Sequence, residues 1–152
     1  MHKLRTLTKS DLPSLLAIEN SVHILPWTLE TFVSCLEAGH RGFVIEIEHD
    51  VVGFVIASIT NEECHILNVC VKVDYQCQGF GCTLVSKALQ DAKERGAGIA
   101  YLEVRRSNTK AIALYEKLKF KEIGVREAYY PGPHDQEDAL IFAKSLVPFV
   151  DY

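Results

Sequence analysis

The segment at residues 75–82 reads YQCQGFGC and holds the first residues that could do chemistry. Its glycines, Gly79 and Gly81, lie between a run of β-branched residues and a long amphipathic segment. Because the first turn of a helix has unpaired N–H donors and the positive end of its dipole, such a loop suits an anion such as pyrophosphate. The spacing is neither G-x-G-x-x-G nor a P-loop, which disfavours dinucleotides and nucleoside triphosphates. A tight turn in which glycine only permits a positive φ is an equally good interpretation.

Glu103 is the carboxylate best placed for proton transfer. Residues 99–105 alternate, which puts Glu103 on one face with Tyr101 and Arg105. A positioned carboxylate could act as a general base. The pattern alone favours a solvent-facing glutamate paired with Arg105.

Tyr115 lies on the apolar face of a predicted helix, with Ala111, Leu114 and Leu118. A tyrosine in that position is usually part of the core. Because a phenol has an ordinary pKa of about 10, it stays protonated at neutral pH and could also donate a proton.

The five cysteines are odd in number, and none forms a C-x-x-C pair. Three fall in or beside apolar runs, where reduced cysteine behaves as a small hydrophobe, so a reducing cytoplasm is expected. Cys77 or Cys82 could be a thiolate nucleophile at a helix N-terminus, but a phosphate in the loop would oppose it. The six histidines show no H-x-x-x-H or H-E-x-x-H spacing, so we expect no metal site.

The elements that must position these residues alternate between strands and helices in the order βααβββαβαββ. Strands are predicted at residues 3–7, 43–47, 51–59, 64–73, 99–105, 121–129 and 138–143. Helices are predicted after residues 8, 28, 79 and 107, where Ser107 can supply the last cap. The Pro131-Gly132-Pro133 turn parts the final two strands. This order predicts an α+β domain with a mixed, mostly antiparallel sheet flanked by helices.

The whole chain of 152 residues is expected to be a single domain, 1–152. A net charge of −4 and a pI near 5.8 argue against nucleic-acid binding. The N-terminal segment has no apolar signal core, and no apolar run is long enough to span a membrane. With no obvious exposed apolar stripe, we expect a monomer.

Several motifs together resemble the GCN5-related N-acetyltransferase (GNAT) family. Gln76-x-x-Gly79-x-Gly81 after a strand is similar to the acetyl-CoA loop of that family. The downstream residues match its second half in order and spacing: Leu102-Glu103-Val104-Arg105, Ser107-Asn108, and residues 111–120. Further matches, from Asp11-Leu12-Pro13 through Pro26-Trp27 and Tyr129-Tyr130-Pro131 to Glu137-Asp138-Ala139, extend the likeness over nearly the whole chain.

The resemblance implies a GNAT-like fold and acetyl-CoA as co-substrate. The pyrophosphate of CoA would be held by backbone N–H groups of Cys77, Gln78, Gly79, Phe80, Gly81 and Cys82. The pantetheine would pair like an added strand with the edge at Val69, Cys70 and Val71, and Asn108 would contact the cofactor through its side chain. Cys77 and Cys82 stand where the family often has arginine, so weaker binding, dominated by backbone donors, is expected.

The resemblance also assigns the chemistry. Glu103 would be the general base, with a raised pKa, and Tyr115 would protonate the CoA sulfur in a direct transfer without an acyl-enzyme. Within the family, the likeness is strongest to enzymes that acetylate the N-terminal alanine of a small-subunit ribosomal protein. Trp27 and Tyr130 could line a peptide cleft, or they could be core residues.

Two alternatives remain open at this point. One is an acetyltransferase that acts on lysine or a small amine, with the same Glu103 and Tyr115. The other is a non-catalytic CoA-binding module, motivated by the two loop cysteines. No membrane or direct nucleic-acid partner is expected under any of these interpretations.

Overall fold

The computed structural model describes residues 2–130 and 136–147. Its strands are β1 (His2–Thr6), β2 (Arg41–Ile47), β3 (Asp50–Thr60), β4 (Glu63–Val71), β5 (Ile99–Arg105), β6 (Lys121–Tyr130) and β7 (Glu137–Ser145). Its α-helices are α1 (Leu12–Val22), α2 (Leu29–Glu37), α3 (Phe80–Glu94) and α4 (Thr109–Lys117). Short 3-10 turns cover Lys9–Asp11 and Val73–Tyr75, and the latter ends β4 two residues before the predicted boundary. The predicted Pro131-Gly132-Pro133 turn lies outside the described residues.

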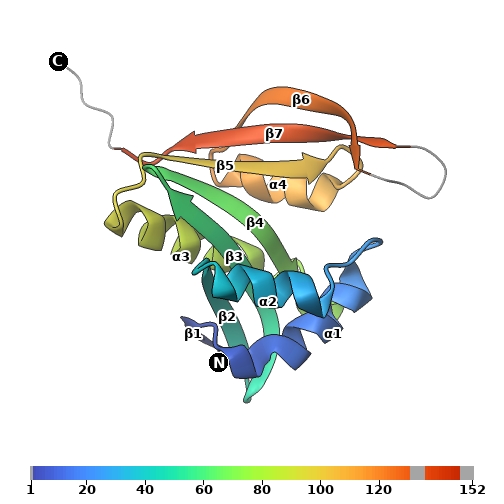
Figure 1. Cartoon of the computed structure of the whole chain (residues 1–152). Helices are drawn as coiled ribbons and strands as arrows, with labels where there is room; N and C mark the ends of the chain where they lie inside the picture. Colours follow the sequence, from blue (N-terminus) through green and yellow to red (C-terminus); the bar gives the residue numbers. More distant parts are fainter. Residues whose placement is uncertain (1, 131–135, 148–152) are drawn as a thin grey trace.

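All seven strands form one mixed sheet in the order β1-β2-β3-β4-β5-β7-β6 (Figure 1). Only β4 and β5 are parallel neighbours, and every other pair is antiparallel. This arrangement confirms the predicted α+β class and order of elements. Among the described residues, no helix is long and apolar enough to cross a membrane.

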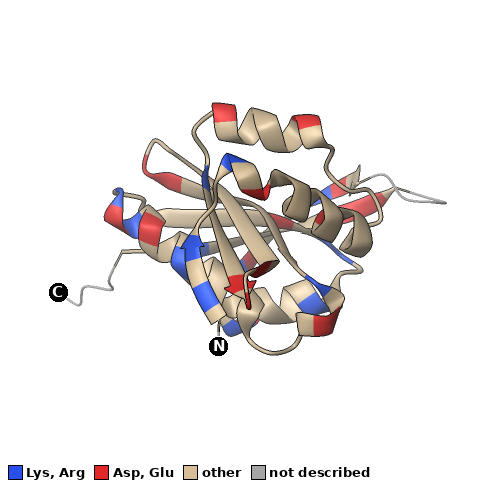
Figure 2. Ribbon diagram, turned by 90° about the horizontal axis from the view of Figure 1, so that it is seen from below, with Lys and Arg blue, Asp and Glu red and all other residues tan. Residues whose placement is uncertain are grey.

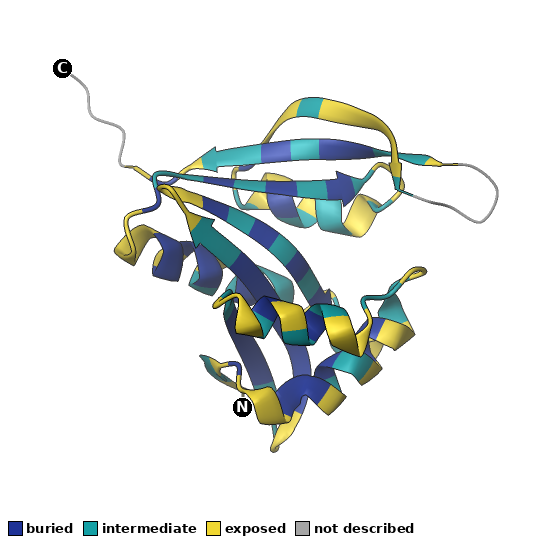
Figure 3. Cartoon of the chain, in the orientation of Figure 1, coloured by how far each residue is buried: buried dark blue, intermediate teal, exposed yellow. Residues whose placement is uncertain are grey.

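Helices cover both faces of the sheet, and each face has its own core (Figures 1 and 3). One core joins α1 and α2 to the sheet through Leu15, Ile18 and Phe32. The other joins α3 and α4 through Leu84 and Tyr115. Because apolar side chains recur at helical spacing, each helix buries one stripe against the sheet.

Carboxylates paired with arginines tie the first segments together. Arg5 on β1 contacts Asp11 at 2.7 Å and Glu46 at 2.6 Å. Arg41 on β2 contacts Asp91 on α3 at 2.9 Å. Charged residues of both signs occur on helices and strands, including the neighbouring basic positions of β1 close to the N-terminus (Figure 2).

The feature that matters most for function is an interruption in the sheet between β4 and β5. Both strands are fully described, yet they pair at only three positions, and His65↔Tyr101 is the last of them. The strands then diverge (Figure 1). On its other side, β4 carries one extra residue, Leu67, because Ala57 pairs with Ile66 while Ile56 pairs with Asn68. The far half of β4 is therefore left with an open edge toward β5.

Candidate active site

The glycine loop ends at the N-terminus of α3. Gly79 is the N-cap and adopts a left-handed φ of +89°, and Cys77 has a φ of +61°. The first backbone hydrogen bond of α3 is donated by the Thr83 N–H to the Gly79 carbonyl at 3.0 Å. Within the described part of the chain, the N–H groups of residues 77–82 have no hydrogen-bond acceptor. The loop therefore presents donors at the positive end of a 15-residue helix, which suits an anion.

Gly81 allows α4 to approach this loop. A Cβ atom at Gly81 would lie 3.2 Å from Cδ2 of Leu114, a tight contact. Gly79 instead has open space around it and is needed for its backbone conformation. The two glycines thus have different roles, one in packing and one in the turn.

Gln76 connects the loop to both of its neighbours. Its Nε2 donates to the Val71 carbonyl at 2.9 Å, and its Oε1 accepts from Nζ of Lys110 at 3.3 Å. Lys110 therefore brings a cation from the first turn of α4 to the edge of the loop. The loop residues alone, with Cys77 and Cys82 among them, gave no sign of this lysine, because its position depends on how α4 docks.

The open edge of β4 offers backbone groups to a ligand. The Lys72 N–H bonds to Val52 on β3, so by alternation the backbone groups of Val71 and Val69 point away from β3. Those of Cys70 point toward β3. The predicted pairing edge thus narrows to Val69 and the N–H of Val71, because Gln76 already occupies the Val71 carbonyl.

Glu103 lies beside the opening between the strands. The Nε2 of His65 on β4 lies 2.5 Å from Oε2 of Glu103 on β5. This hydrogen bond lowers the pKa of Glu103, although partial burial opposes the shift. The predicted raised pKa is therefore wrong, because a donor to the carboxylate outweighs desolvation. Arg105, the expected partner, instead donates to Glu137 at 3.3 Å.

Tyr115 is a core residue of α4, 8% exposed. Its ring packs 5.9 Å from that of Phe120 and 6.5 Å from that of Phe142. Burial raises its pKa, and the nearby Tyr130 adds to the shift. The phenol therefore stays protonated across the physiological range. Glu103 in turn acts on Tyr130, whose pKa is raised to about 12, chiefly by burial, so Tyr130 lies within electrostatic reach of both groups.

Asn108, rather than Ser107, caps α4. Its Oδ1 accepts from the Ala111 N–H at 3.2 Å, and the Ser107 N–H donates to Glu137 at 3.1 Å. The cap uses one lone pair of the carboxamide oxygen of Asn108, and its amide group is left for the predicted contact with a cofactor.

On the α1 side of the sheet, Glu19 anchors the turn that carries Trp27. Glu19 is 1% exposed; its Oε2 accepts from the Trp27 N–H at 2.8 Å and its Oε1 accepts from Asn68 at 3.0 Å. The Trp27 ring packs 5.2 Å from Phe32, so this side chain belongs to the α1–α2 core.

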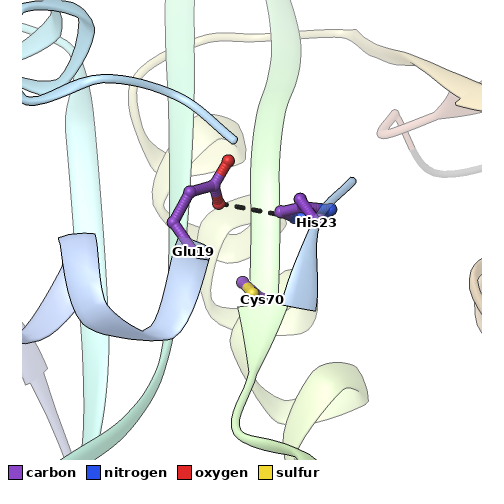
Figure 4. Close-up of side chains that lie close together, drawn as sticks. All are labelled: Glu19, His23 and Cys70. Carbon is purple, nitrogen blue, oxygen red and sulfur yellow. Dashed lines mark ion pairs between the residues drawn. The ribbon is translucent and has the colours of Figure 1, made fainter. Parts of the chain in front are cut away.

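His23 and Cys70 lie against Glu19 (Figure 4), with ligand atoms all within 4.8 Å. Nε2 of His23 is 3.4 Å from Oε1 of Glu19. Burial, with the Glu19 charge, raises the pKa of the Cys70 thiol to about 12, which keeps it protonated. Since both oxygens of Glu19 already accept hydrogen bonds, this group acts as an anchor between α1 and β4.

Comparison with known proteins identifies the class to which this fold and site belong. A sequence model of the acetyltransferase (GNAT) family matches residues 2–120, so the chain belongs to this family. The chain is 36% identical to the ribosomal protein bS18-alanine N-acetyltransferase of Escherichia coli over 143 residues, or 94% of this chain and 97% of that one. Its Salmonella typhimurium counterpart is 34% identical over the same shares.

Solved structures agree with this assignment. The crystal structure of the corresponding Escherichia coli enzyme superposes with a TM-score of 0.92 at 34% identity, covering 99% of this chain and 97% of that one. Arabidopsis thaliana NAA60 in complex with acetyl-CoA has the same fold, with a TM-score of 0.86 at 19% identity and coverage of 95% and 98%.

Proposed function

We propose that this protein transfers the acetyl group of acetyl-CoA to an N-terminal α-amino group, that of the alanine of ribosomal protein bS18. The choice of acceptor rests on the similarity of this chain to bS18-alanine N-acetyltransferases, which extends over 94% of the chain. The whole chain, residues 1–152, would work as one domain, since a single sheet runs from β1 to β7.

The described residues fit acetyl-CoA on physical grounds. The backbone donors of residues 77–82 suit its pyrophosphate, and Lys110 adds a positive charge beside them. The open edge at Val69 offers an N–H and a carbonyl to the amide groups of a pantetheine. Asn108 retains a free amide group near the start of α4.

Glu103 and Tyr115 divide the proton transfers between them. Glu103 faces away from the α3–α4 core, whereas Tyr115 lies within it, so the two approach the opening from opposite faces of the sheet. As the amine nitrogen bonds to the acetyl carbon, Glu103 takes the amine proton directly or through a water. As the carbon–sulfur bond breaks, Tyr115 gives its proton to the sulfur.

An α-amine suits a base of this kind. Its ordinary pKa is about 8, against about 10.4 for lysine, so a larger neutral fraction exists at neutral pH. Glu103, whose pKa is lowered, then needs to take only the proton released during attack. This favours an N-terminal acceptor over a lysine side chain.

The test is acetyl transfer to a peptide that carries the N-terminal sequence of bS18, followed by release of free CoA and by mass spectrometry of the product. The expected result is one acetyl group on the α-amine. The matched controls are the same peptide with a blocked N-terminus, a lysine peptide and a polyamine. Faster acetylation of either alternative amine would contradict the proposed acceptor. Binding of acetyl-CoA without turnover on any amine would contradict the enzymatic function.

A further inference from the structure

We propose that His65 is a positioning residue for Glu103: its Nε2–H holds one carboxylate oxygen, turns the other toward the acceptor amine, and makes proton uptake depend on the charge of the imidazole. This inference rests on the proposed function and adds a residue that the glycine loop, Glu103 and Tyr115 do not include.

The His65–Glu103 pair lies at the point where β4 and β5 stop pairing. His65 occupies the last paired position of β4 before the strands diverge, opposite Tyr101 of β5. Glu103 lies two residues further along β5, on the same face as Tyr101. The hydrogen bond between His65 and Glu103 therefore bridges the strands where their backbone pairing stops. Since His65 contacts Oε2, we assign Oε1 as the oxygen that receives the amine proton.

The two side chains of the pair differ in their exposure to solvent. The His65 side chain is 40% exposed, whereas that of Glu103 is 16% exposed. Water therefore reaches the imidazole more readily than the carboxylate. The imidazole can exchange protons with solvent while the carboxylate stays shielded for its work on the acceptor.

Charged and titratable groups on β5 and β6 surround the pair. Arg126 on β6 acts on Glu103 as a permanent cation, and Tyr130 on β6 is a neutral phenol over the physiological range. On β5, Tyr101 and Arg105 flank Glu103. Unlike the arginines and tyrosines around it, histidine is a residue type that changes charge between about pH 5 and 8. When His65 is charged, the carboxylate faces two cations and is a weaker base; when His65 is neutral, it still orients the carboxylate with less opposition to proton uptake.

The test compares His65→Gln and His65→Leu. Glutamine keeps an N–H donor but cannot titrate, and leucine removes the donor at similar volume. The kcat is measured from about pH 5.5 to 9 with both substrates saturating. The fall of kcat on the acidic side, the acidic limb, then reports on the enzyme with both substrates bound. His49→Gln is the matched control, because His49 is exposed in the β2–β3 turn. Circular dichroism and thermal unfolding check that each variant folds.

The wild type and His49→Gln are expected to lose kcat toward the acidic end of this range. His65→Gln should keep most of its activity at high pH and show a shallower acidic limb, because only the acceptor amine and Glu103 still titrate. His65→Leu should lower kcat at high pH by about tenfold or more, with the KM for acetyl-CoA unchanged. An unchanged acidic limb in His65→Gln, or wild-type kcat in His65→Leu, would overturn the proposal.

The same series separates this proposal from the proposed function. If Glu103→Gln is inactive while both His65 variants behave as the wild type, only the role of His65 fails. If Glu103→Gln keeps full activity on the bS18 peptide, the general-base assignment fails, and the role of His65 falls with it.

Discussion

Nζ of Lys110 lies 3.3 Å from Oε1 of Gln76, and the other end of the same carboxamide donates to the Val71 carbonyl at 2.9 Å. A single glutamine thus joins the end of β4, the glycine loop and the first turn of α4. It also holds a lysine where Cys77 and Cys82 leave the loop without a charged side chain.

Lys110→Ala is expected to weaken acetyl-CoA binding by about threefold to tenfold, because an exposed cation near a phosphate contributes modestly. Isothermal titration at low and high salt measures the effect, which should shrink at high salt. Lys117→Ala, an exposed lysine at the other end of α4, is the control and should bind as the wild type. Equal affinities for the two variants would contradict a role for Lys110.

Cys77→Arg is expected to tighten acetyl-CoA binding by about threefold to tenfold, since it adds a charged donor to an exposed loop position. Cys82→Arg should have a smaller effect. Cys82 lines a groove of about 380 Å³ with Leu4 and Lys87, so its side chain is directed between α3 and β1. Titration of both variants with acetyl-CoA measures the difference in affinity. A larger gain in affinity from Cys82→Arg would show that the phosphates bind in this groove.

Gly79→Ala and Gly39→Ala form a matched pair, because both glycines have a left-handed φ, +89° and +79°. At neither position would an added Cβ have another atom within 4 Å. Each alanine should cost about 1–2 kcal/mol of stability, lowering Tm by about 2–4 °C per kcal/mol. Only Gly79→Ala should also weaken acetyl-CoA binding, because only it redirects the loop donors. Thermal unfolding with and without acetyl-CoA distinguishes them; equal stabilisation by acetyl-CoA in both would refute the loop assignment.

Glu103→Gln and Tyr115→Phe should each lower kcat by roughly 100-fold or more while leaving acetyl-CoA affinity nearly unchanged. The first removes the proton acceptor and the second the proton donor, and both keep side-chain volume. Steady-state kinetics with the bS18 peptide, alongside titration of acetyl-CoA, checks the expectation. Full activity in either variant rules out the corresponding role.

Stability should fall in acid as Asp11 is protonated. Two hydrogen bonds from Arg5, at 2.7 and 2.9 Å, lead the interactions that lower the pKa of Asp11 below its ordinary 3.8. Because the folded-state pKa is the lower one, the stabilisation is present above pH 3.8 and is lost as the pH falls through the folded value.

Asp11→Asn should therefore lower the free energy of unfolding by about 2 kcal/mol at neutral pH. The difference from the wild type should shrink below about pH 4. Urea unfolding across this range measures it. Asp50→Asn, at an exposed position, should change stability by less than about 0.5 kcal/mol. A constant difference for Asp11→Asn at every pH would show that its effect is not electrostatic.

Local patterns predicted the elements, because apolar spacing decides which face each helix and strand buries. They could not predict the register between strands far apart in sequence. His65 was missed because it reaches Glu103 only through the parallel pairing of β4 with β5. Lys110 was missed because its role depends on the docking of α4 beside the loop.

Simple alternation along β4 would also give the wrong faces. The extra residue at Leu67 reverses the faces, so that Cys64 and Ile66 join the α3 core while Asn68 and Cys70 point toward α1. A period of two, continued through this strand, assigns half of its side chains to the wrong side. The raised pKa that the family resemblance implied for Glu103 was wrong for a related reason, since the hydrogen bond from His65 that lowers it depends on strand pairing.

The three paired positions between β4 and β5 act as a joint between two half-sheets, β1–β4 and β5–β7. Each half keeps its own antiparallel ladder, and the hydrogen bonds of those ladders do not cross this joint. Three paired positions and the His65–Glu103 contact therefore join the half-sheets beside the opening, and beneath them both halves share one buried core.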